Sequence, residues 1–106
     1  MVPAMTVVGA YECVEEFLAA DPSVDVVALD LRLNSGDPGD PRIQGIHAVR
    51  RVAQDYRVCI YTDERRRLVL ANCLSAGASG VVHKTDTPQT LAEALATVAG
   101  GGVRIT

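Results

Sequence analysis

The stretch Val24-Asp25-Val26-Val27-Ala28-Leu29-Asp30 carries the main signal for the fold. It is short, rich in β-branched residues and almost continuously apolar up to its last residue. Parallel strands covered by helices on both faces have this composition, because neither face meets water. Residues 58–61 and 80–82 have the same character, and residues 6–8 form a shorter run. We therefore expect a parallel sheet that includes these four segments.

Segments with helical spacing of apolar residues lie between these strands. The stripes consist of Val14, Phe17 and Leu18; Ile46, Val49 and Val52; Leu70, Cys73, Leu74 and Gly77; and Leu91, Leu95 and Val98. In the last helix, Thr87 can cap the start, Pro88 suits the first position and Gly100 can take the left-handed conformation that ends it. Strands that alternate with helices predict a doubly wound α/β domain, because crossovers between parallel strands are right-handed.

Length and composition indicate one globular domain. The chain has 106 residues, of which 48% are apolar and 22% charged, and two separate cores in this length would each be too small to fold alone. No apolar run approaches the roughly 20 residues of a membrane-spanning helix, and the start has no signal-peptide pattern. We expect a cytoplasmic protein without membrane contact. The net charge of -3 argues against direct DNA binding, because proteins that bind the phosphate backbone usually carry a basic excess.

The cysteines and histidines do not form a metal-binding pattern. Cys13, Cys59 and Cys73 are widely spaced and include no Cys-x-x-Cys pair, so we expect reduced core thiols. His47 and His83 have no partner at ligand spacing and are expected to be structural.

Two segments are expected to lie outside the helices and strands. Residues 34–44 combine glycines, prolines and aspartates, which predicts an exposed loop directly after a strand. Residues 100–106 begin with three glycines and are expected to be a linker stub, so that residues 1–99 form the domain.

Polar side chains stand at the carboxyl ends of three predicted strands. Asp30 ends the first, Thr62 follows the second and Lys84 follows the third. In an open parallel sheet these ends form the crevice where ligands bind. An acid, a hydroxyl and an ammonium group at one rim suit a phosphoryl or other anion site, with the carboxylate as nucleophile or metal ligand.

Three stretches resemble the receiver domain of two-component response regulators: VVALDLRL at 26–33, YT at 61–62 and SAGASGVVHK at 75–84. The likeness spans nearly the whole chain. Residues 91–102 further resemble the last receiver helix and the linker of regulators with a LuxR-type helix-turn-helix domain. The resemblance implies a flavodoxin-like, doubly wound parallel sheet with strand order 2-1-3-4-5.

The resemblance also implies roles for the residues at the strand ends. Asp30 would be the phosphoacceptor for a sensor histidine kinase, Thr62 and Lys84 would bind phosphoryl oxygens, and Asp30 with the backbone carbonyl of Arg32 would coordinate magnesium. Such a domain is no enzyme beyond self-catalysed phosphotransfer to Asp30. DNA would be bound only through an effector domain that this chain does not contain.

The chain departs from the receiver pattern at its start. The usual first strand and helix, with the acidic pair that binds magnesium, would precede Met1. The lost strand is a central one, so we expect a gap between residues 7–8 and 26–27. An open apolar face and an unpaired strand favour association, which predicts a homodimer. Loop residues Asp37 and Asp40 either restore metal ligation or are solvated.

Asp63 is a second departure, because receivers usually have a small residue beside the threonine. Its carboxylate would crowd and repel a phosphoryl group, replace a metal ligand, or cap the next helix. An alternative function is therefore a phosphorylation-independent pseudo-receiver used for dimerisation or ligand sensing. A haloacid dehalogenase-type phosphohydrolase ranks third, since that chemistry needs an acid where this chain has Arg32.

Overall fold

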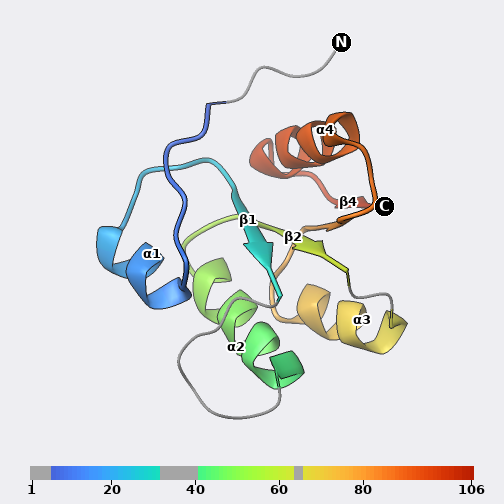
Figure 1. Ribbon diagram of the computed structural model, residues 1–106, viewed down its shortest axis with the longest axis horizontal. Helices are drawn as coiled ribbons and strands as arrows, with labels where there is room; N and C mark the ends of the chain where they lie inside the picture. Colours follow the sequence, from blue (N-terminus) through green and yellow to red (C-terminus); the bar gives the residue numbers. More distant parts are fainter. Residues whose placement is uncertain (1–5, 32–40, 64–65) are drawn as a thin grey trace.

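The computed structural model describes residues 6–31, 41–63 and 66–106. Helices and strands alternate along the chain (Figure 1). The elements are α1 (Val14–Ala20), β1 (Val27–Asp30), α2 (Pro41–Ala53), β2 (Val58–Thr62), α3 (Arg67–Ser75), β3 (Gly80–His83), α4 (Pro88–Ala99) and β4 (Arg104–Ile105). Among the described residues, no helix has both the length and the apolar character needed to cross a membrane.

The strands of the described segments form one sheet in the order β1-β2-β3-β4, and every neighbouring pair is parallel. Helices α1, α2 and α3 lie on one side of the sheet and α4 on the other (Figure 1). The flavodoxin-like α/β class predicted from the sequence is thereby confirmed. Parallel pairing has a direct consequence for the site: the carboxyl ends of β1, β2 and β3 meet at one edge.

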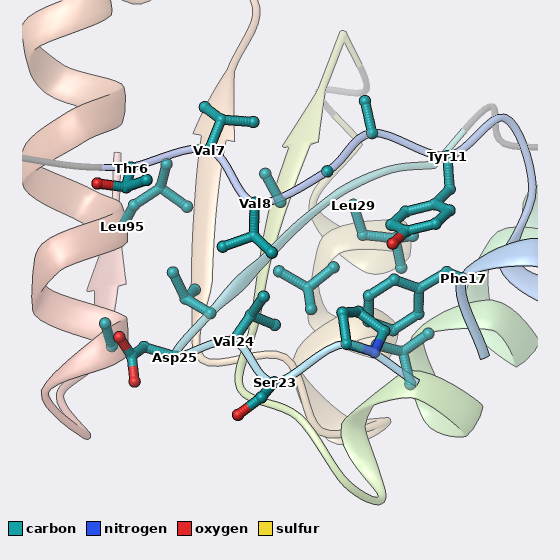
Figure 2. A pocket seen from close by; sticks show the side chains of 18 of the residues that line it. Thr6, Val7, Val8, Tyr11, Phe17, Ser23, Val24, Asp25, Leu29 and Leu95 are labelled. Carbon is teal, nitrogen blue, oxygen red and sulfur yellow. The ribbon is translucent and has the colours of Figure 1, made fainter. Parts of the chain in front are cut away.

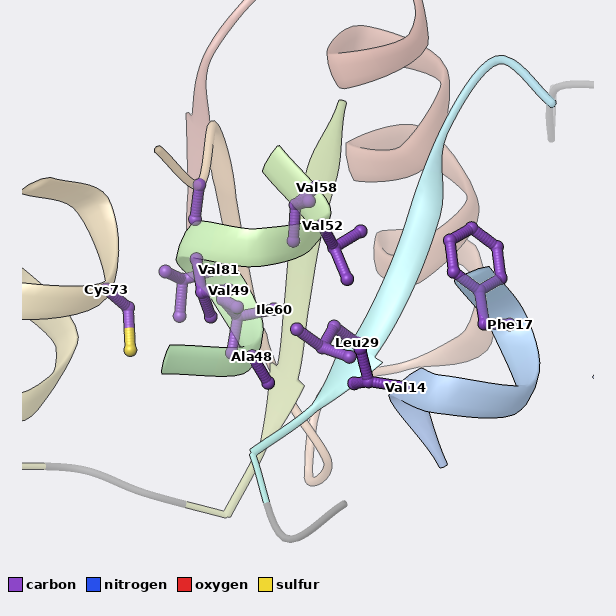
Figure 3. Packing of buried hydrophobic residues seen from close by; sticks show 11 residues of the cluster. Val14, Phe17, Leu29, Ala48, Val49, Val52, Val58, Ile60, Cys73 and Val81 are labelled. Atoms are coloured by element: carbon purple, nitrogen blue, oxygen red, sulfur yellow. The ribbon is translucent and has the colours of Figure 1, made fainter. Parts of the chain in front are cut away.

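The core is aliphatic and lies in two layers. In the first layer, Leu29, Ile60 and Val81 of neighbouring strands pack against α1, α2 and α3 (Figure 3). The second layer joins Cys59 and Val82 to Ala94 and Val98 of α4. The two layers take alternate residues of β2, as the pleat of a strand requires, and both faces of β2 are buried.

The start of α4 agrees with the sequence-based prediction, and its end differs by one glycine. The Thr87 side chain accepts a hydrogen bond from the backbone N–H of Thr90, and Pro88 occupies the first turn, as predicted. Gly100 does not take the left-handed conformation, since its φ is -80°; Gly101, with φ 92°, does. The left-handed glycine that follows α4 is therefore Gly101 and not Gly100.

Three segments differ from the sequence-based expectation. The predicted loop at 34–44 overlaps α2, which already begins at Pro41, a residue suited to a first helical turn. Residues 6–8 form no strand, because no described strand lies beside them to complete a ladder. Residues 104–105, inside the predicted linker stub, form β4 on the outer edge of β3. The domain boundary at 99/100 stays a prediction.

The three cysteines are free thiols, and Cys59 and Cys73 are buried. Burial raises the pKa of the Cys59 thiol from 9.0 to about 11, because the apolar layer under α4 disfavours the thiolate. Cys13 is only partly buried. The cysteines therefore differ in their access to thiol reagents.

We expect a thiol reagent at slightly alkaline pH to modify Cys13 in the native chain and to spare Cys59 until the chain unfolds. Peptide mass mapping after alkylation, with and without urea, measures this. As the pH rises from 9.0 towards about 11, the unfolded chain loses the Cys59 proton first, so the free energy of unfolding falls. The variant Cys59→Ala is expected to show a shallower fall, and an equal slope would contradict the burial argument.

Truncation of the central strand tests the packing. Ile60 is fully buried, and Ile60→Ala is expected to lower the free energy of unfolding by about 2–5 kcal/mol through lost burial and a residual cavity. Leu68, in α3, is 74% exposed, so Leu68→Ala is the matched control and should change stability by less than about 0.5 kcal/mol. Urea unfolding followed by circular dichroism compares them. Equal losses would mean that β2 is not the centre of the core.

Candidate functional site

The carboxyl ends of three neighbouring strands carry the candidate site. Asp30 is the last residue of β1, Thr62 is the last residue of β2, and Lys84 directly follows β3. The register places Asp30 opposite Tyr61 and Thr62 opposite His83. These residues lie at one edge because all three strands run in the same direction.

The structure brings Asp30 and Lys84 into direct contact. Lys84 Nζ donates a hydrogen bond of 2.6 Å to Asp30 Oδ2, and the two residues are 54 positions apart in the sequence. The side chain of Asp30 is 37% exposed and that of Lys84 is 26% exposed, so the pair is open to solvent and to a ligand. A carboxylate beside an ammonium group, at an accessible strand end, is an arrangement that can receive a transferred phosphoryl group and balance its charge.

The Lys84 side chain is positioned by its own turn. The backbone N–H of Lys84 donates to the carbonyl of Thr62 at 2.8 Å, which extends the β2–β3 ladder past the strand end. Lys84 Nζ lies 5.9 Å from the centre of the Tyr61 ring, within cation–π range. Asp86 Oδ2 accepts hydrogen bonds from the His83 backbone N–H at 2.9 Å and from Thr106 Oγ1 at 2.7 Å. The turn that carries Lys84 is therefore tied at both ends.

Thr62 is buried, with 2% of its surface exposed. Its strand, β2, lies between β1, which ends at Asp30, and β3, which Lys84 follows. Asp63 is exposed. The expectation that Asp63 caps the next helix is wrong, because Arg66 holds the N-cap position of α3. Arg32, whose carbonyl was expected to bind metal, lies outside the described residues, as do Asp37 and Asp40.

Sequence reasoning missed two residues of this rim. The sequence pattern identifies Tyr61 only as a strand residue, whereas the structure places its ring 5.9 Å from Lys84 Nζ. Asp86 anchors the turn through a bond to the backbone three residues earlier, and the pattern His-Lys-Thr-Asp after a strand is a signal for such a turn. His83 is partly buried, and its Nδ1 has no hydrogen-bond partner.

Asp30 supplies one carboxylate at the rim that suits a magnesium ion. Across residues 6–31, 41–63 and 66–106, no three acids, histidines or cysteines gather into a metal-binding group. Magnesium, however, is commonly held by one or two carboxylates together with phosphate oxygens and water. The Asp30 carboxylate can supply one such ligand.

Comparison with known proteins shows a likeness to regulatory proteins. No family model matches the chain. Over 98 residues it is 37% identical to a probable transcriptional regulatory protein, SgaR, of Hyphomicrobium methylovorum. That match covers 91% of this chain and 44% of SgaR, so the chain spans less than half the length of this curated relative.

Solved structures with a similar fold include receiver domains of response regulators. The isolated receiver domain of RcsB from Salmonella enterica, solved with the phosphate mimic BeF3⁻, has a TM-score of 0.77 at 22% identity, with 95% of this chain and 74% of that one covered. A LuxR-family response regulator from Aurantimonas has a TM-score of 0.65 at 29% identity, covering 86% and 61%. The receiver domain of NarL from Mycobacterium tuberculosis has a TM-score of 0.61 at 28% identity, covering 84% and 67%.

We expect Lys84→Ala to change the free energy of unfolding by less than about 1 kcal/mol, because solvent screens the attraction between two partly exposed charges. Urea unfolding measures it. Arg104→Ala is the matched control, since its guanidinium lies 3.8 Å from the Glu93 carboxylate in another partly exposed pair. A loss of several kcal/mol for Lys84→Ala alone would mean that the ion pair serves the fold and not a ligand.

Proposed function

We propose that this chain, a receiver domain of the response-regulator type, accepts a phosphoryl group on Asp30 and so serves as the signal input of a transcriptional regulator. The contact between Lys84 Nζ and Asp30 Oδ2 carries this proposal. It supplies a nucleophile and a fixed positive charge at the one edge of the sheet where the strand ends converge.

The reaction follows from the groups at the rim. A carboxylate oxygen of Asp30 attacks the phosphorus of a phosphohistidine on a sensor kinase, a P–O bond forms and the P–N bond breaks. The histidine leaves as a neutral imidazole after taking up a proton from water, and Asp30 becomes an acyl phosphate. The Lys84 ammonium group then pairs with a phosphoryl oxygen in place of the carboxylate. The Thr62 hydroxyl is the hydrogen-bond donor for another oxygen.

Magnesium fits this proposal as a partner of the phosphoryl oxygens. It would be held by Asp30 and by the backbone carbonyl of Arg32, and it supplies charge neutralisation when bound. Lys84 alone offers one positive charge against a group that carries nearly two negative charges at neutral pH. The Asp30 site therefore gains from a second cation.

The partners of the whole protein are proposed from the likeness to regulators. A sensor histidine kinase supplies the phosphoryl group, and an effector domain beyond this chain binds DNA in the cytoplasm. The net charge of -3 agrees with an input domain that does not itself hold the phosphate backbone.

Asp63 favours a second candidate function, a pseudo-receiver that works without phosphorylation. It follows Thr62 directly and is exposed at the same rim. A carboxylate there repels an incoming phosphoryl group, since two like charges within a few ångströms oppose each other strongly.

Phosphorylation with acetyl phosphate and magnesium tests the proposal. We expect intact-mass spectrometry to show one added phosphoryl group on the wild-type chain and none on Asp30→Asn. Asp25→Asn is the matched control, because Asp25 is exposed before β1 and away from the rim. Asp63→Ala is expected to raise the phosphorylated fraction by relieving repulsion, and Lys84→Ala to lower it.

A wild-type chain that takes up no phosphoryl group, while Asp63→Ala does, would favour the pseudo-receiver. Uptake that persists in Asp30→Asn would contradict Asp30 as the acceptor. Circular dichroism of each variant confirms that the comparison is made between folded chains.

A further inference from the structure

Lys84 is the single lysine of the chain, and its position depends on a short turn. The turn joins β3 to α4 through residues 84–87, of which Thr85 and Thr87 are exposed. Packing of apolar side chains therefore contributes little to the shape of this turn. Because a lysine ammonium group sits on a long and flexible stem, its place at the rim depends on how firmly the backbone beneath it is held. Hydrogen bonds supply this hold.

The Asp86 side chain closes the turn. Asp86 Oδ2 accepts a hydrogen bond of 2.9 Å from the backbone N–H of His83, and the backbone N–H of Asp86 donates to the His83 carbonyl at 2.9 Å. Both backbone groups of the residue before Lys84 are thus bonded to Asp86. Helix α4 does not need this carboxylate at its start, because the Thr87 hydroxyl accepts the N–H of Thr90 and caps the helix.

The same oxygen of Asp86 is bonded to the segment after α4. Thr106 Oγ1 donates to Asp86 Oδ2 at 2.7 Å, a length typical of a bond from a hydroxyl group to a charged carboxylate. The sheet holds Thr106 by a separate bond, since its backbone N–H donates to the Val81 carbonyl at 3.0 Å. The Asp86 carboxylate therefore connects an exposed turn to a segment that the sheet already fixes.

We propose that Asp86 is a positioning residue of the candidate site and that it acts through Lys84. With its carboxylate in place, Lys84 Nζ stays 2.6 Å from Asp30 Oδ2; without it the turn loosens and the ammonium group spends less time at the rim. The consequence for phosphorylation rests on the proposed function, in which the ammonium group has to meet the phosphoryl oxygens. The contact between Lys84 and Asp30 does not rest on that function and is measured separately.

Two other acids serve as matched controls. The Glu93 carboxylate lies 3.8 Å from the Arg104 guanidinium, so it contacts β4 from α4. Asp25 is exposed before the start of β1, at the end opposite to Asp30. It lines a groove of about 650 Å³, and residues 83–86 are not among the residues that line this groove (Figure 2). Glu93→Ala and Asp25→Ala each remove one carboxylate and leave the Asp86 bonds in place.

Labelling of the single lysine tests the contact without phosphorylation. An amine reagent followed by peptide mass mapping gives the rate at which Lys84 reacts, and Asp30→Asn gives the rate without the protecting carboxylate. We expect Asp86→Ala to raise the wild-type rate roughly two- to fivefold towards that of Asp30→Asn, which is the protection that a partly exposed ion pair can give. Glu93→Ala and Asp25→Ala should leave the rate unchanged.

The kinetics of phosphoryl uptake from acetyl phosphate and magnesium test the consequence. Lys84→Ala is expected to lower the rate at saturating acetyl phosphate by about a hundredfold and Asp86→Ala by about tenfold, since a displaced charge keeps part of its effect. Because Asp86 acts through Lys84, the double variant should lose no more than Lys84→Ala alone. If Asp86 served only the fold, its loss would add to that of Lys84.

Milder variants examine the bonds of Asp86. Thr106→Val removes the hydroxyl group and keeps the backbone bond, so it should raise the labelling rate less than Asp86→Ala does, and Thr106→Ser should keep the wild-type rate. Thr97→Val is the control, since the Thr97 hydroxyl donates to the Glu93 carbonyl within α4. Asp86→Asn keeps the shape without the charge, and its rate should rise in the same direction. It replaces Asp86→Ala if circular dichroism shows that the alanine variant is unfolded.

Four results would overturn the proposal: a wild-type Lys84 that reacts as fast as in Asp30→Asn, an unchanged labelling rate in Asp86→Ala, an equal rise in Glu93→Ala, or additive losses in the double variant. A wild-type chain that takes up no phosphoryl group would instead contradict the proposed function. In that case a raised labelling rate in Asp86→Ala would still support the positioning of Lys84 by Asp86.

Discussion

Parallel pairing of β1, β2 and β3 is the constraint on which the rest of the structure depends. It brings the carboxyl ends of three strands to one edge, and so places Asp30 within 2.6 Å of Lys84, 54 residues later. Parallel pairing also requires crossovers, which in this chain are helices that cover the faces of the sheet. The site and the aliphatic core are therefore two results of the same topology. The central strand β2, whose buried residues Ile60 and Cys59 lie in opposite layers of the core, belongs to both.

The candidate site combines rigid and accessible parts. Lys84 is held by its backbone bond to Thr62 and by a turn that Asp86 ties to His83 and to Thr106. The charged groups themselves are partly exposed, which leaves the pair accessible to a ligand. The bond from Thr106 also joins the end of the chain to the turn beside Lys84.

Local pattern was enough to predict α1 to α4, strands β1 to β3, the Thr87 cap and the three polar strand ends, because each depends on residues close in the chain. The resemblance supplied the chemical roles. Pattern alone did not decide whether residues 6–8 form a strand, which glycine after α4 takes the left-handed conformation, the strand at 104–105, or the place of Tyr61 and Asp86 beside Lys84. Each of these depends on partners distant in sequence: a β-prone segment becomes a strand only when another strand lies beside it, and such neighbours are set by the tertiary structure.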